Sequence, residues 1–62
     1  MTTQDYASRV DSYIYQHDGV LGPELTIEMR TTLAGERPLT LEDSERWTYS
    51  IDRHVEARLS RH

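Results

Sequence analysis

Three histidines are the first candidates for chemistry, because imidazole is a common metal ligand and a general base near neutral pH. His17, His54 and His62 form neither a His-x-x-x-His nor a Glu-x-x-His pair, so no two ligands share one helical face. The chain has no cysteine, which excludes thiolate ligands, thiol nucleophiles and disulfides. We therefore expect no metal and no cofactor, with His17 hydrogen-bonded at the edge of the core.

The hydroxyl and carboxylate residues do not form the pattern of a catalytic site. All the serines fall at helical positions, whereas a nucleophilic serine is typically exposed on a strand-to-helix turn. The three glycines do not form a phosphate-binding loop, and adjacent acids such as Glu42 and Asp43 are typical of a solvated helix surface. A substrate pocket of about 300 Å³ is also hard to enclose in so short a chain. The sequence therefore predicts a protein that is not an enzyme.

Aromatic and arginine side chains are better candidates, because these residue types are enriched at the energetic centres of protein interfaces. Arg46, Tyr49 and Arg53 recur at spacings of three, four and seven, and therefore share one helical face. The predicted partner-binding residues are Tyr15, Arg46, Trp47, Tyr49, Arg53 and Arg58. Local pairing is the competing interpretation, since Glu42 precedes Arg46 by four residues and acids flank Arg53.

Periodic apolar residues predict the helices that position these side chains. The first helix is expected over 3–18, with Thr2 or Thr3 as its cap, Asp5 in its first turn and a left-handed Gly19 at its end. Its apolar stripe consists of Tyr6, Ala7, Val10, Tyr13, Ile14 and His17.

The second helix is expected over 23–34, because Gly22 and Pro23 form a typical helix start and Gly35 a typical stop. Its core stripe is Leu25, Met29 and Leu33, while Ile27 and Ala34 lie on the opposite side, which suggests that two faces of this helix are covered.

The third helix is expected over 41–60, where Thr40 and Asp43 approximate a capping box. At about 30 Å it is longer than the other two and overhangs them. The predicted fold is therefore all-α: one domain over 1–62, a small three-helix bundle with two short helices and a long C-terminal helix. Such small domains rarely draw more than about 3–5 kcal/mol from their cores, so we expect a homodimer that forms through the third helix or the first. The residues assigned to self-association are Ile51, Val55 and Leu59.

The charge distribution argues against nucleic acid as a partner. Eleven acids against seven arginines give a net charge of -4, and lysine is absent. Residues 1–45 hold nine acids and three arginines (-6), and residues 46–62 hold four arginines and two acids (+2). Non-specific binding to nucleic acid depends on neutralising phosphates, so only the C-terminal segment could supply it. No apolar run of about 18 residues and no signal peptide are present, so we expect a cytoplasmic protein without a membrane span.

We expect a small interaction module that binds a larger protein and modulates it. Its size and lysine-free composition resemble those of phage accessory proteins, and the absence of lysine suggests a GC-rich gene. One alternative is a dimeric helix-turn-helix-like DNA-binding regulator, although the acids at 42–45 would repel phosphates at the end that reads bases. A second alternative is a nucleic-acid mimic that inhibits a basic protein. Its acids would be Asp5, Asp11, Asp18, Glu24, Glu28 and Glu36.

Overall fold

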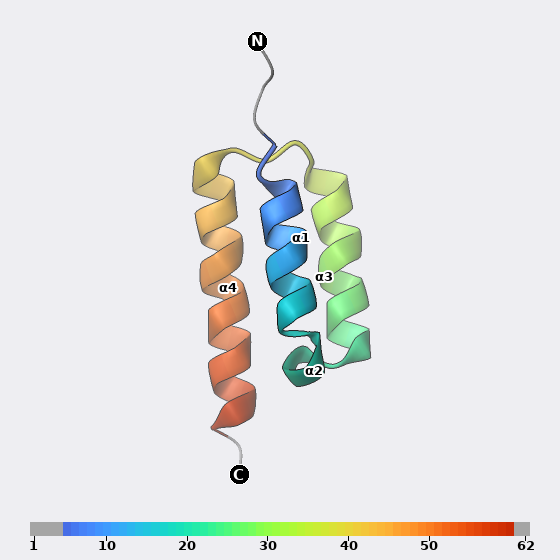
Figure 1. The fold of residues 1–62 in the computed structure, drawn as a ribbon, viewed down its shortest axis with the longest axis vertical. Helices are drawn as coiled ribbons and strands as arrows, with labels where there is room; N and C mark the ends of the chain where they lie inside the picture. Colours follow the sequence, from blue (N-terminus) through green and yellow to red (C-terminus); the bar gives the residue numbers. More distant parts are fainter. Residues whose placement is uncertain (1–4, 61–62) are drawn as a thin grey trace.

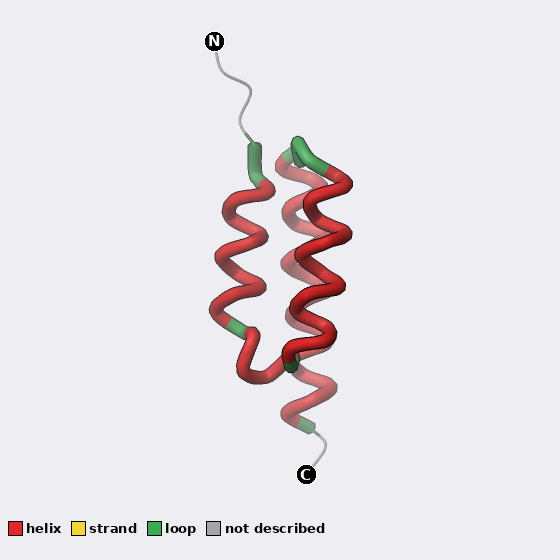
Figure 2. Tube along the Cα trace, turned by 90° about the vertical axis from the view of Figure 1, so that its right-hand side faces the viewer, coloured by secondary structure: helices red, strands yellow, loops and turns green. Residues whose placement is uncertain are grey.

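The computed structural model describes residues 5–60 and shows four helices in that range, with no strand (Figure 1). The helices are α1 (Ala7–Gln16), α2 (Asp18–Leu21), α3 (Pro23–Glu36) and α4 (Leu41–Leu59). Figures 1 and 2 show that α1 and α4 run in the same direction and α3 in the opposite one. The one-turn helix α2 closes the end where the chain passes from α1 to α3. The predicted all-α fold is confirmed, and α2 is a fourth helix that the apolar spacing does not predict.

The start of α1 is later than the sequence predicts. Asp5 lies outside the helix, and its carboxylate accepts a hydrogen bond of 3.0 Å from the backbone N–H of Ala7. The Asp5 carboxylate thus accepts from a backbone N–H at the start of α1 that has no partner within the helix. Asp5 itself does not lie in the first turn, where the sequence places it. The expected cap at Thr2 or Thr3 lies outside the described residues.

The predicted first helix divides at His17, where the backbone (φ -110°, ψ 10°) ends α1. The next turn is α2, and it contains Gly19, which is not left-handed as expected. The chain instead reverses at Gly22, which has φ 89° and leads directly into Pro23 at the start of α3. The extra turn brings Leu21 into the core, where it is 1% exposed. The burial of Leu21 accounts for the shift of the reversal from Gly19 to Gly22.

The helix α3 begins at Pro23 as predicted but passes through Gly35 and ends at Glu36. Arg37 is extended (φ -63°, ψ 145°), which is the conformation that a following proline favours. Pro38, and not Gly35, therefore sets the end of this helix.

The helix α4 begins with the predicted capping box. The Asp43 N–H donates to the Thr40 hydroxyl at 3.1 Å, and the Thr40 N–H donates to the Asp43 carboxylate at 3.2 Å. Its 19 residues extend past the α2 end of the bundle, as Figure 2 shows. The predicted overhang is therefore present, and residues 56–60 are all exposed.

The core lies between α1 and the other helices, because α1 packs against both α3 and α4 while α2 contacts both at one end. Its buried apolar residues are Ala7, Val10, Ile14, Leu21, Met29, Leu33, Leu39 and Ile51. Ile51 is the one fully buried apolar residue that α4 provides. Because Ile51 packs inside its own chain at 0% exposure, it is not available for the self-association that we predict from the sequence. Val55 is half-buried against the core and Leu59 is 56% exposed.

Candidate functional site

The outward side of α4 carries the three residues that the sequence places on one face. Arg46 donates to Glu42 at 3.1 Å in an ion pair whose side chains are 74% and 75% exposed. Tyr49 is 63% exposed, and the Arg53 guanidinium lies over its ring at 5.8 Å from the centroid. Arg53 Nη1 also donates to the Tyr49 hydroxyl at 3.2 Å. Local pairing thus occupies Arg46, whereas Arg53 stacks on a tyrosine and forms no ion pair within residues 5–60.

The other predicted binding residues lie elsewhere on the molecule. Trp47 is half-buried against the core, and its indole N–H donates to Glu36 at the end of α3 at 3.0 Å. Arg58 Nη1 lies 3.8 Å from the position that a Cβ on Gly22 would occupy, so this arginine lies beside the α2–α3 turn. Tyr15 projects from α1 and is 65% exposed. The six predicted residues therefore belong to four separate places, and only Arg46, Tyr49 and Arg53 form one surface.

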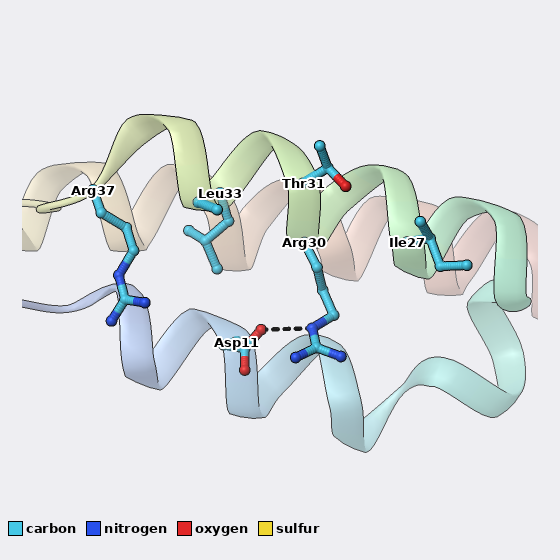
Figure 3. A pocket seen from close by; sticks show the side chains of 7 residues that line it. Asp11, Ile27, Arg30, Thr31, Leu33 and Arg37 are labelled. Carbon is cyan, nitrogen blue, oxygen red and sulfur yellow. Dashed lines mark hydrogen bonds and ion pairs between the residues drawn. The ribbon is translucent and has the colours of Figure 1, made fainter.

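A shallow groove of about 480 Å³ runs between α1 and α3 (Figure 3). Arg30 of α3 and Arg37, which directly follows α3, reach towards α1 across it, and Arg30 Nε donates to Asp11 at 2.9 Å. Ile27 lines the groove and is 65% exposed, so the second apolar face of α3 is not covered within the described chain. The spacing of Ile27 and Ala34 points to this surface in the sequence. The groove offers aliphatic contacts and paired charges.

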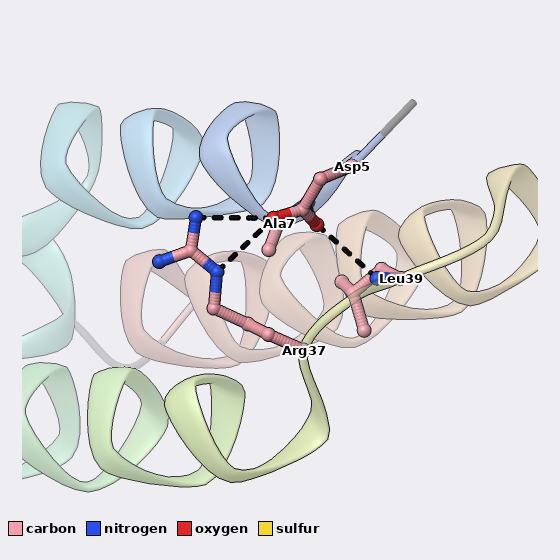
Figure 4. A network of polar contacts seen from close by, with 4 residues as sticks. All are labelled: Asp5, Ala7, Arg37 and Leu39. Atoms are coloured by element: carbon pink, nitrogen blue, oxygen red, sulfur yellow. Dashed lines mark hydrogen bonds and ion pairs between the residues drawn. The ribbon is translucent and has the colours of Figure 1, made fainter. Parts of the chain in front are cut away.

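The Asp5 carboxylate holds the other end of the bundle together (Figure 4). Its Oδ1 accepts from the N–H groups of Ala7 at 3.0 Å and Leu39 at 3.2 Å. Its Oδ2 accepts from Arg37 Nε at 3.2 Å and Nη2 at 3.1 Å. We call these four hydrogen bonds the Asp5 clasp. The Ala7 and Leu39 N–H groups, and then Arg37, lower the pKa of Asp5. The clasp joins the start of α1 to the α3–α4 connection and has a structural role.

A polar contact also joins α1 to α4. The Tyr13 hydroxyl donates to the Asp52 carboxylate, and this bond raises the pKa of Tyr13, with burial contributing less. His17 packs against Tyr13 with ring centroids 4.5 Å apart and donates from Nδ1 to the Tyr13 carbonyl at 2.9 Å. His17 thus occupies the expected hydrogen-bonded place at the core edge.

Metal-binding clusters are absent from the described part of the chain, where no three His, Asp or Glu side chains converge. His54 is exposed, and its Nδ1 lies 2.8 Å from the Ser50 carbonyl. His62 lies outside residues 5–60. Within that range, no helix has both the length and the apolar character needed to cross a membrane.

No protein-family model matches the chain, and neither the curated proteins nor the solved structures contain a significant match to it.

Proposed function

We propose that this protein is a non-enzymatic interaction module that binds carboxylate groups of a larger protein through the outward face of α4, and so modulates that partner. The observation that carries the proposal is Arg53, which is held over the exposed Tyr49 ring without an acidic partner in residues 5–60. A guanidinium binds carboxylates in a planar, bidentate geometry, and a stacked one loses less freedom on binding. Arg46 lies on the same face, and its exposed pair with Glu42 can be exchanged for a partner's acid at small cost.

The charges near the start of α4 disfavour DNA as the partner. Glu42 and Glu45 are exposed there, and a recognition helix reads bases with its N-terminal residues. Phosphates would be repelled at that end. A protein partner can instead place single carboxylates opposite Arg46 and Arg53.

Self-association through the overhanging end of α4 is part of the proposal. Leu59 is exposed there, and Val55 is only half-buried, so a second copy can cover both. Leu59→Asp is expected to give a monomer with unchanged helix content, because Leu59 contributes little to the core of its own chain. Analytical ultracentrifugation of wild type and variant tests this, and a monomeric wild type removes the dimer from the proposal.

The binding proposal is tested by affinity capture from a lysate of the native source, with and without nuclease. Wild type is compared with Arg53→Gln and with Arg30→Gln, which removes the same charge from the α1–α3 side. One stoichiometric protein that resists nuclease, is retained by Arg30→Gln and is lost with Arg53→Gln is the expected result. Capture that is unchanged by Arg53→Gln contradicts the proposal. Nucleic acid that co-purifies and disappears with nuclease favours the DNA-binding regulator instead.

A further inference from the structure

A second arginine has the same environment as Arg53, on a different helix. The Arg9 guanidinium lies over the Tyr6 ring, 5.5 Å from its centroid, and Arg9 is exposed. Arg9 forms no ion pair with an acid in residues 5–60. Two Tyr–Arg stacks therefore exist, one at the start of α1 and one in the middle of α4.

The Tyr13–Asp52 hydrogen bond sets the relative height of the two stacks along the bundle. The helices α1 and α4 run in the same direction (Figure 1). The height of a residue along the bundle axis therefore follows from how many residues separate it from Tyr13 on α1 or from Asp52 on α4. Arg9 precedes Tyr13 by four residues, and Arg53 follows Asp52 by one. The two arginine positions are thus offset by five residues, or roughly 7–8 Å along the bundle axis, with Arg9 nearer the end where α1 and α4 begin.

The two stacks also lie on the same side of the α1–α4 pair. On α1, each residue advances about 100° around the axis, which places the buried Val10 and Ile14 to one side of Tyr13 and Arg9 to the other. Arg9 is therefore on the outer side of the contact with α4.

The arrangement on α4 is the counterpart of that on α1. The buried Ile51 lies to one side of Asp52, whereas Tyr49 and Arg53 lie to the other. Both guanidiniums thus emerge on the outer surface that α1 and α4 share.

We infer that Tyr6, Arg9, Tyr49 and Arg53 form one recognition face, the two-stack face, which binds a protein segment presenting two carboxylates. This inference rests on the proposed function and adds α1 and Arg9 to its binding site. Each stack holds its guanidinium over a ring and leaves N–H groups at the edge for an acceptor. Two such groups on neighbouring helices, offset by roughly 7–8 Å along the axis, bind a pair of acids more selectively than one stack could.

The acids around this face indicate a protein segment instead of a phosphate chain. Glu45 and Glu56 are exposed on the outer side of Asp52, next to the Tyr49–Arg53 stack. They repel a continuous line of phosphates, whose binding depends on many neutralised charges. A folded segment can avoid them and present one carboxylate to Arg9 and another to Arg53.

The first test is an NMR titration of the ¹⁵N-labelled full chain, observed at the arginine Nε–Hε signals. The probe is a synthetic 12-residue peptide rich in glutamate, and the controls are the same peptide with glutamine and inorganic phosphate. The signals of Arg9 and Arg53 are expected to move together with one midpoint, while that of Arg30 stays in place. Equal movement of all arginines, or equal effects of phosphate, overturns the inference.

The second test compares Arg9→Gln with Arg30→Gln, which lose the same charge from opposite sides of α1. Loss of one charged hydrogen-bond donor predicts that Arg9→Gln weakens peptide binding about tenfold or more, with Arg30→Gln near wild type. If Arg53→Gln weakens binding and Arg9→Gln does not, the two-helix face is wrong and the α4 site remains. If neither weakens it, the proposed function fails as well.

Discussion

Arginine has different roles on the two sides of α1. On the α3 side, Arg30 and Arg37 are bound to Asp11 and Asp5, so their charges are neutralised within the fold. On the α4 side, Arg9 and Arg53 lie over tyrosine rings and meet no acid in the described chain. The difference separates side chains that hold the bundle together from side chains that remain available to another molecule. Net charge alone does not reveal it, because the same residue type occurs on both sides.

The largest expected effect tests how each side is anchored in the core. The helix α4 has one buried apolar residue, Ile51, whereas α3 has two, Met29 and Leu33. Ile51→Ala is expected to cost about 2–5 kcal/mol of unfolding free energy, as large-to-small core changes do. Chemical denaturation measures this, and hydrogen exchange should show α4 opening before α3. The exposed Leu59→Ala is the control, and an equal loss there would contradict the anchoring role of Ile51.

The next effect concerns the Asp5 clasp. Asp5→Asn keeps the shape but loses the charge that Arg37 and two backbone N–H groups bind, so the melting temperature is expected to fall more than for any exposed substitution. The folded pKa of Asp5 is lowered, so its stabilisation is complete above the ordinary value of about 4. It is lost as the pH falls from there through the folded pKa. Thermal melts across pH 2–6 should show this slope in wild type and a shallower one in Asp5→Asn. Equal slopes would mean that the clasp does not stabilise the fold.

A smaller effect is expected at the contact between α1 and α4. Tyr13→Phe removes the hydroxyl that donates to Asp52, at a cost of about 0.5–1.5 kcal/mol of unfolding free energy. Because the pKa of Tyr13 is raised in the folded state, its stabilisation is complete below about pH 10 and is lost at higher pH. Urea denaturation at pH 7 and above pH 10 measures both. A variant as stable as wild type would show that this bond does not hold α4 in place.

The smallest stability effects separate the two arginine roles most directly. Arg30→Gln breaks an exposed ion pair and is expected to cost about 0.2–1 kcal/mol of unfolding free energy. Arg53→Gln is expected to change stability by less than about 0.5 kcal/mol, because it breaks no ion pair. Binding should show the reverse order. If Arg53→Gln destabilises the fold more than Arg30→Gln does, the stack is structural and the contrast between the two sides is lost.

Local signals predict the fold well where one residue decides the backbone. Pro23 marks the start of α3, and the pair of Thr40 and Asp43 marks the start of α4. The division at His17 is not predictable from spacing, because Gly19 is a plausible helix stop until the burial of Leu21 is known. Long-range packing decides this boundary.

The candidate site is only partly predictable for the same reason. Spacing places Arg46, Tyr49 and Arg53 together, but it cannot show that Trp47 bonds to Glu36 across the bundle. Arg9 is absent from the predicted set because its position beside the Tyr49–Arg53 stack depends on how α1 packs against α4. A Tyr-x-x-Arg spacing within one helix is the sequence signal that would have identified Arg9.

The Asp5 clasp has a consequence for the order in which the protein forms. Asp5 can cap α1 as soon as Ala7 has been made, yet its bonds to Arg37 and Leu39 must wait until the ribosome has released more than thirty further residues. A fragment that stops at the end of α3 would keep the helix cap but lack both later partners. Asp5 therefore gains its full set of bonds only after Arg37 and Leu39 have been made, so assembly of this end of the bundle comes late in synthesis.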